Sequence, residues 1–144
     1  MDDIEVEQEV TDFLLLARSF SEYPSAAAAY CRQSLELIVH HLHYKEYGKY
    51  PEPDPKGNYP SLIKVWNGVK KNLDKQTSEV IFSINAQTRG ALHYDYKTSK
   101  ETLKKHHIEV VITQICNVFF DSFDIEILLG GVSRFVSKTD HVWV

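Results

Sequence analysis

Apolar residues recur every three or four positions along most of the first 121 residues, which is the spacing of one face of an α-helix. This pattern predicts five helices, over about residues 3–20, 24–47, 60–73, 75–92 and 98–121. Pro24 and Pro60 suit the first turns of the second and third helices, because a missing N–H needs no partner there. Residues 98–101, Thr-Ser-Lys-Glu, form a capping box at the start of the fifth helix. No alternation of strands and helices is present, so we predict an all-α, up-and-down bundle.

The same periodicity predicts which side chains face the core of this bundle. One residue set comes from each helix, in chain order: Val6, Val10, Phe13, Leu14 and Ala17; Ala27, Cys31, Leu35, Ile38 and Leu42; Leu62, Trp66, Val69 and Leu73; Val80, Ile84 and Ala91; Leu103, Val110, Val111, Gln114, Ile115 and Val118.

Two segments lack a helical period. Residues 48–59 contain three of the five prolines and two of the six glycines, which predicts one long loop. Loops of this length often carry function. Residues 122–144 include Gly130 and Gly131 and show no clean pattern, so we expect an irregular C-terminal extension that packs back onto the bundle, is extended, or meets a partner. The chain is therefore predicted to be one domain, 1–144, with the bundle over 3–121 and the extension over 122–144.

Composition narrows the class of protein. With 43% hydrophobic and 25% charged residues, the chain is neither disordered nor collagen-like. Cys31 and Cys116 fall in apolar helical stripes, so we interpret them as buried thiols in a reducing compartment. The acidic N-terminus is unlike a signal peptide, and no apolar run approaches the roughly 20 residues of a membrane span. We expect a cytoplasmic protein without a membrane partner.

Charge and histidine spacing exclude further classes of site. A formal charge of −4 lacks the basic footprint of a duplex-binding protein, although a local phosphate site remains compatible with it. His40, His41 and His43 lie close together on the second helix, and His106 and His107 form a second group. Neither group has cysteine or carboxylate companions at the spacing of a structural zinc site, so we interpret these histidines as exposed and predict no metal. No glycine-rich phosphate loop is present, and we predict no cofactor.

The strongest candidate for chemistry lies at the end of the fourth helix. Asn85, Arg89 and His93 are spaced by four and share one helix face, and Tyr96 follows His93 by three. A guanidinium binds phosphate oxygens in a fork, and an imidazole can transfer protons near neutral pH, so these residues suit a phosphodiester. In the alternative interpretation, Arg89 pairs with a carboxylate such as Glu36, while His93 and Tyr96 cap the helix.

A second polar group lies on the second helix. Arg32 and Glu36 form an i,i+4 pair next to the apolar stripe of Cys31 and Leu35. This pair is either a surface ion pair or part of a polar network at the edge of the core.

Three segments together resemble a known family. Residues 28–42, Ala-Ala-Tyr-Cys-Arg-Gln-Ser-Leu-Glu-Leu-Ile-Val-His-His-Leu, and residues 84–93, Ile-Asn-Ala-Gln-Thr-Arg-Gly-Ala-Leu-His, are similar to two helices of HEPN-like domains. These domains occur in bacterial and phage defence proteins, including the helical domain of some type I restriction subunits. The capped helix from Thr98 also has its counterpart there, so the resemblance covers about residues 10–121.

The resemblance implies a helical bundle that often forms homodimers. In active members, an Arg and a His on one helix cleave RNA without metal, which would make Arg89 and His93 the catalytic residues. The residues expected to contact the RNA or nucleotide are Asn85, Tyr96, Arg32 and Glu36.

The spacing of the two catalytic candidates bears on whether the protein is a binding module or a ribonuclease. Three residues separate Arg89 from His93, where the ribonuclease pattern has four to six. This spacing favours a non-catalytic binding or dimerisation module of a toxin–antitoxin or abortive-infection-like system, contacting RNA, a nucleotide, or a partner such as a cognate antitoxin. The alternative is a metal-independent endoribonuclease that acts as a toxin.

Overall fold

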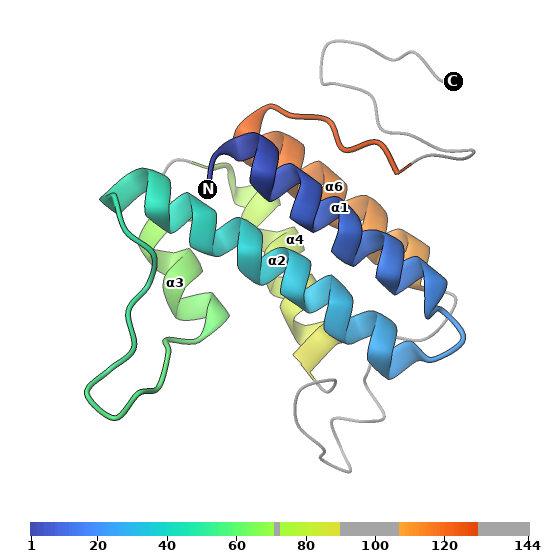
Figure 1. Cartoon of the computed structure of the whole chain (residues 1–144), viewed down its shortest axis with the longest axis horizontal. Coiled ribbons are helices and arrows are strands. Elements are labelled where there is room, and N and C mark those ends of the chain that lie inside the picture. Colours follow the sequence, from blue (N-terminus) through green and yellow to red (C-terminus); the bar gives the residue numbers. More distant parts are fainter. Residues whose placement is uncertain (71–72, 90–106, 130–144) are drawn as a thin grey trace.

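The computed structural model describes residues 1–70, 73–89 and 107–129, and the regular secondary structure in these ranges is helical (Figure 1). Five helices follow in chain order: α1 (Asp3–Ser19), α2 (Pro24–Tyr47), α3 (Leu62–Val69), α4 (Lys75–Thr88) and α6 (Ile108–Phe123). None of the described ranges contains a strand. The predicted all-α bundle is thereby confirmed.

Helix α2 lies at the centre of the bundle. It packs against α1, α3, α4 and α6, whereas α1 packs mainly against α2 and α6. Pro24 begins α2, and Gly48 ends it in the left-handed conformation at φ 76°, which a glycine adopts without steric cost. Because α2 contacts each of the other four described helices, its polar side chains can connect elements that are distant in sequence.

Short polar side chains begin three of the other helices. Asp2 accepts a hydrogen bond from the backbone N–H of Glu5 at 2.8 Å at the start of α1, and Asp74 and Ser61 cap α4 and α3 in the same way. The cap explains one error in the predicted boundaries. We expected the third helix from residue 60, but Ser61 is the N-cap and α3 begins at Leu62.

The ends of the later predicted helices agree only in part with the structure. Helix α3 ends at Val69 rather than near residue 73, and α6 continues to Phe123, two residues beyond the prediction. Asp124 then closes α6 at φ 58°. The predicted continuation of α4 to residue 92 and the capping box at 98–101 lie outside the described residues.

The core contains most of the predicted side chains, with Trp66 as the largest of them. Among the predicted residues, Phe13, Leu42, Leu73, Val80 and Gln114 are half-buried, and Ala91 and Leu103 lie outside the described ranges. One prediction was wrong: the Val110 side chain is 54% exposed, while Val111 is buried. Successive helical residues are turned by about 100°, so the face of α6 that meets the bundle includes Val111 and Ile115 but not Val110.

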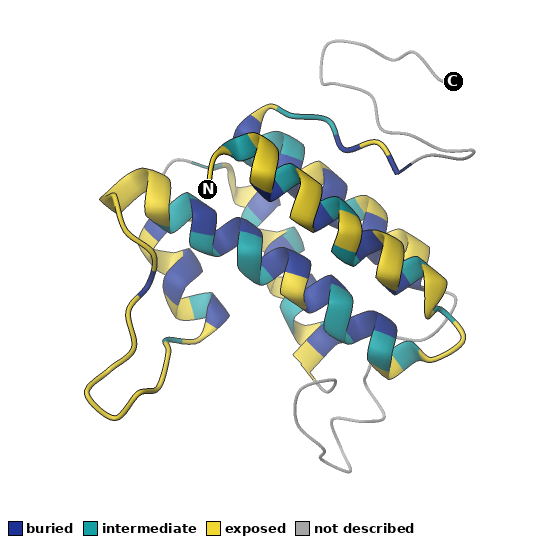
Figure 2. Ribbon diagram, in the orientation of Figure 1, coloured by how far each residue is buried: buried dark blue, intermediate teal, exposed yellow. Residues whose placement is uncertain are grey.

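The two segments without a helical period behave differently (Figure 2). Residues 48–60 form the predicted loop, which is mostly exposed but buries Pro51. Residues 125–129 are not helical, and Ile127 and Leu129 are buried against the bundle. The C-terminal extension therefore begins by packing back onto the core, and residues 130–144 lie outside the description.

Candidate functional site

A buried guanidinium joins α2 to α4. Nη1 of Arg32 donates a hydrogen bond to Oδ1 of Asn85 at 2.8 Å and approaches the backbone oxygen of Asn85 at 3.4 Å and Oγ1 of Thr88 at 3.5 Å. The Arg32 side chain is 10% exposed. The structure thus brings together two of the predicted site residues, Arg32 and Asn85, which are 53 positions apart in the sequence.

Glu36 completes this network from one turn further along α2. Its Oε1 lies 3.3 Å from Nε of Arg32, an ion pair without hydrogen-bond geometry. Burial lowers the pKa of Arg32, the charge of Glu36 raises it, and the charge of Arg89 lowers it. Of the two interpretations of Arg32 and Glu36, the network at the edge of the core is the correct one.

Arg89 has a different environment from Arg32. It is exposed at the end of α4, directly after Thr88, and close enough to Arg32 for its charge to affect the pKa of that group. In the described part of the chain, Glu36 pairs with Arg32 rather than with Arg89, so the predicted Arg89–Glu36 pair is not formed there. Arg89 therefore presents its guanidinium to solvent, where it can bind an anion.

The other two predicted residues of this site, His93 and Tyr96, lie outside the described residues. The structure consequently describes four of the six candidates. Arg32 contacts both Glu36 and Asn85, and Arg89 lies near Arg32.

His40 extends the site along α2, which the sequence analysis missed. It lies one turn beyond Glu36 and is half-buried. Burial lowers the pKa of His40, the charge of Glu36 raises it, and the charge of His43 lowers it. The spacing of four from Glu36 and of three to His43 was the signal that could have revealed this. Five residues, which we call the α2 stripe, thus follow one face of the helix: Arg32, Glu36, His40, His43 and Tyr47.

His41 was predicted to be exposed, and this prediction was wrong. Its ring is buried, with Nε2 2.8 Å from Oδ1 of Asp3 at the start of α1 and its centroid 5.2 Å from that of Phe123. Lys45 also donates to Asp3, at 2.9 Å. Burial raises the pKa of Asp3, but hydrogen bonds from His41 and Lys45 and their charges outweigh this and lower it overall. The acidic partner of His41 is 38 positions away, beyond any local spacing rule.

In the described ranges, neither the cysteine thiols nor the metal-binding residue types form a second candidate site. Cys31 and Cys116 are buried and unpaired, as predicted. Burial raises the pKa of each thiol to about 12, which makes both poor nucleophiles. No group of three His, Cys, Asp or Glu suited to a metal ion occurs among residues 1–70, 73–89 and 107–129. In the same ranges, no helix combines the length and apolar character needed to cross a membrane.

Comparison of the chain with models of protein families, with curated proteins and with solved structures finds no match.

Proposed function

We propose that this protein is a non-catalytic HEPN-like module of a bacterial or phage defence system that binds single-stranded RNA through a phosphate held by Arg89. The observation that carries the proposal is the contrast between two arginines. Arg32 is buried and hydrogen-bonded to Asn85, whereas Arg89 is exposed beside it. A guanidinium that is open to solvent can donate hydrogen bonds to phosphate oxygens without first breaking internal hydrogen bonds.

The contacts of Glu36 and Asn85 favour binding over cleavage. The Glu36 carboxylate is paired with Arg32, and the Asn85 carboxamide, which bonds to the same guanidinium, is not a proton-transfer group. General acid–base catalysis needs a group within hydrogen-bond reach of the transferred proton. The short spacing between Arg89 and His93 supports the same choice.

RNA binding is tested by fluorescence anisotropy with a labelled 12-nucleotide single-stranded RNA and the full chain. Replacing Arg89 by alanine (Arg89→Ala) is expected to weaken binding about tenfold. It should also lower the slope of the logarithm of affinity against the logarithm of salt concentration by about one, as loss of one phosphate contact does. Lys75→Ala is the matched control, because it removes one exposed positive charge at the opposite end of α4. Equal affinities for Arg89→Ala and Lys75→Ala would contradict the proposal.

Cleavage is tested with the same RNA in the presence of a chelator. We expect the RNA to remain intact on a denaturing gel. Cleavage that disappears in both Arg89→Ala and His93→Ala would replace this proposal with the metal-independent endoribonuclease.

We further propose that the module forms a homodimer in the cytoplasm, and that this homodimer binds a cognate antitoxin or defence protein. Apolar side chains at the junction of α1 and α2 support a protein contact: Leu16 and Phe20 are each 39% exposed, and Tyr23 is 67% exposed. Light scattering of the purified chain should give twice its 16.6 kDa mass. A monomer at micromolar concentration would exclude the homodimer.

A further inference from the structure

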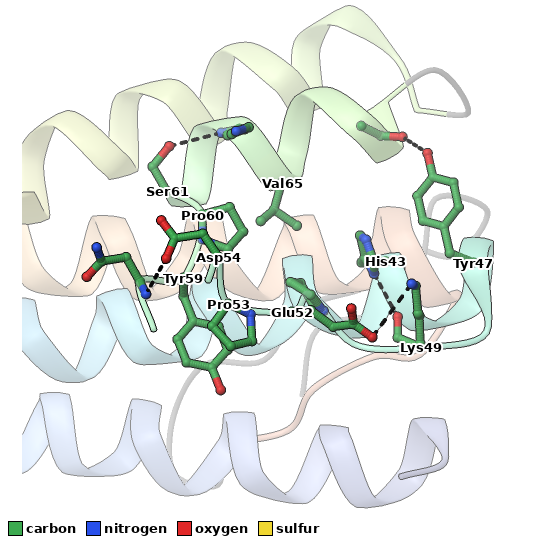
Figure 3. Close-up of a pocket in the computed structure, with 14 residues that line it drawn as sticks. His43, Tyr47, Lys49, Glu52, Pro53, Asp54, Tyr59, Pro60, Ser61 and Val65 are labelled. Atoms are coloured by element: carbon green, nitrogen blue, oxygen red, sulfur yellow. Dashed lines mark hydrogen bonds and ion pairs between the residues drawn. The ribbon is translucent and has the colours of Figure 1, made fainter. Parts of the chain in front are cut away.

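A pocket of about 640 Å³ opens at the other end of the α2 stripe (Figure 3). Its wall combines His43 and Tyr47 from α2, Pro53 and Tyr59 from the loop, and Lys64 and Val65 from α3. We call it the loop pocket. It lies apart from the Arg32 network, since Arg32 and Tyr47 are 15 residues, or about 22 Å, apart along the helix.

Hydrogen bonds hold the frame of the loop pocket in place. The Tyr47 hydroxyl donates to the backbone oxygen of Gly68 at 2.7 Å, joining α2 to α3. Oδ1 of Asp54 accepts from the N–H groups of Lys56 and Asn58, each at 2.9 Å, which fixes the turn of the loop. The pocket is therefore defined by internal bonds, although the loop itself is exposed.

His43 gives the pocket a directed hydrogen-bond acceptor. Its Nδ1 lies 2.7 Å from the backbone oxygen of Lys49. A carbonyl oxygen only accepts, so Nδ1 carries the proton and the neutral ring has its lone pair on Nε2. No partner of Nε2 occurs among the residues that the structure describes. Nε2 can thus accept a hydrogen bond from an amino or imino group of a ligand.

Aromatic rings supply the second feature of the site. Tyr59 is 66% exposed at the rim and Tyr47 is 49% exposed, with the Tyr47 ring centroid 4.7 Å from that of His43. Exposed tyrosines of this kind form stacking surfaces for planar bases, because every base has a π-face.

Local charge supplies the third feature. The pocket is lined by two lysines and two carboxylates, Lys49, Lys64, Glu52 and Asp54, so its formal charge is zero. Asp54 is engaged with the loop backbone and Glu52 with Lys49, whereas Lys64 has no ion pair in the described ranges. Lys64 is therefore the lysine of the pocket best placed for a phosphate.

We infer that the loop pocket binds a nucleobase, which stacks on Tyr59 and donates a hydrogen bond to Nε2 of His43 while its phosphate faces Lys64. That the base belongs to RNA rests on the proposed function. A free nucleotide would present the same base and phosphate.

The test titrates the full chain separately with the labelled 12-nucleotide RNA and with adenosine monophosphate. Tyr59→Ala is expected to weaken binding about tenfold or more, as loss of one stacked base does, and Tyr59→Phe to retain it. Tyr44→Ala is the matched control, because Tyr44 is 38% exposed on α2 and does not line the pocket. Adenosine monophosphate should also shift the ring ¹⁵N signals of His43 in NMR spectra.

The possible results separate the two proposals. If Arg89→Ala weakens RNA binding but Tyr59→Ala behaves like Tyr44→Ala, the loop pocket is not a base site and the proposed function stands. If adenosine monophosphate binds in a Tyr59-dependent way and RNA does not bind, the pocket is a free-nucleotide site and the proposed function falls. If neither the RNA nor adenosine monophosphate binds, both proposals are overturned.

Discussion

Two buried polar side chains of α2 each connect this helix to a different helix, and they do so with different chemistry. Arg32 connects α2 to α4 through Asn85, and His41, nine positions later, connects α2 to α1 through Asp3. The guanidinium is always charged and has many donors, so it needs several acceptors around it. The imidazole can be neutral and is held by one strong contact, while its buried Nδ1 has no hydrogen-bond partner among the residues that the structure describes.

The comparison indicates which end of the bundle responds to acid. The hydrogen bond between Arg32 and Asn85 joins a permanent charge to a neutral amide, so this bond persists over a wide pH range. The His41 contact depends on the ionisation of Asp3. The helices that position Arg89 are thus held by the pH-independent connection, whereas the start of α1 is held by the pH-dependent one.

The largest expected effect concerns Arg32. Arg32→Ala should lower the free energy of unfolding by about 2 to 3 kcal/mol, because the Asn85 amide would lose its charged partner at a buried site. Urea denaturation at neutral pH measures this change. Gln33→Ala, at the exposed next residue of the same helix, should stay within about 0.5 kcal/mol. Equal effects of the two substitutions would show that Arg32 does not connect the helices.

A double-mutant cycle isolates the contact itself. Arg32→Ala and Asn85→Ala are expected to be non-additive, with a coupling free energy of about 1.5 kcal/mol, because each substitution removes the same hydrogen bond. Arg32→Ala and Lys75→Ala should instead add within about 0.5 kcal/mol, since Lys75 begins α4 and does not contact the network. The four unfolding free energies of each cycle come from urea titrations.

The Asp3 contact should be weaker and dependent on pH. The folded pKa of Asp3 is lowered from its ordinary value of 3.8, so its contribution is full above that value and is lost as pH falls through the lowered one. Asp3→Asn should therefore cost about 1 kcal/mol or less at pH 7, as its side chain is partly exposed, and progressively less below about pH 4.

The control for this pH dependence is Asp12→Asn, at an exposed position of the same helix. Unfolding free energies of the three proteins are compared between about pH 7 and pH 3. A difference between wild type and Asp3→Asn that stays constant over this range would rule out an ionisation-dependent contact.

The smallest effect is expected for Lys45. Its ammonium lies 2.9 Å from Asp3, but its side chain is 46% exposed. Lys45→Ala should change the free energy of unfolding by less than about 0.5 kcal/mol, and high salt should abolish the change. A loss above about 1 kcal/mol would mean that Lys45, and not His41, holds Asp3.

Local signals predicted the first two helices well. Asp2, Pro24 and Gly48 each act within one turn of a helix end, so the bounds of α1 and α2 follow from neighbouring residues. At α3 two such signals compete, and the Ser61 cap determines the start rather than Pro60. The candidate site was harder to predict. The i,i+4 spacing indicated Arg32 with Glu36, but Asn85 was assigned to a ligand.

By itself, the sequence determined the helical class, the long loop and the i,i+4 pair of Arg32 and Glu36 on α2, because these depend on propensities and spacings within a few residues. Tertiary structure alone decided that Arg32 is buried against Asn85, that His41 is buried against Asp3, and that Arg89 remains exposed. These outcomes depend on how each helix is rotated and which helix packs against it. Burial then sets the effect of a charge, since a group removed from water needs partners that a solvated group does not.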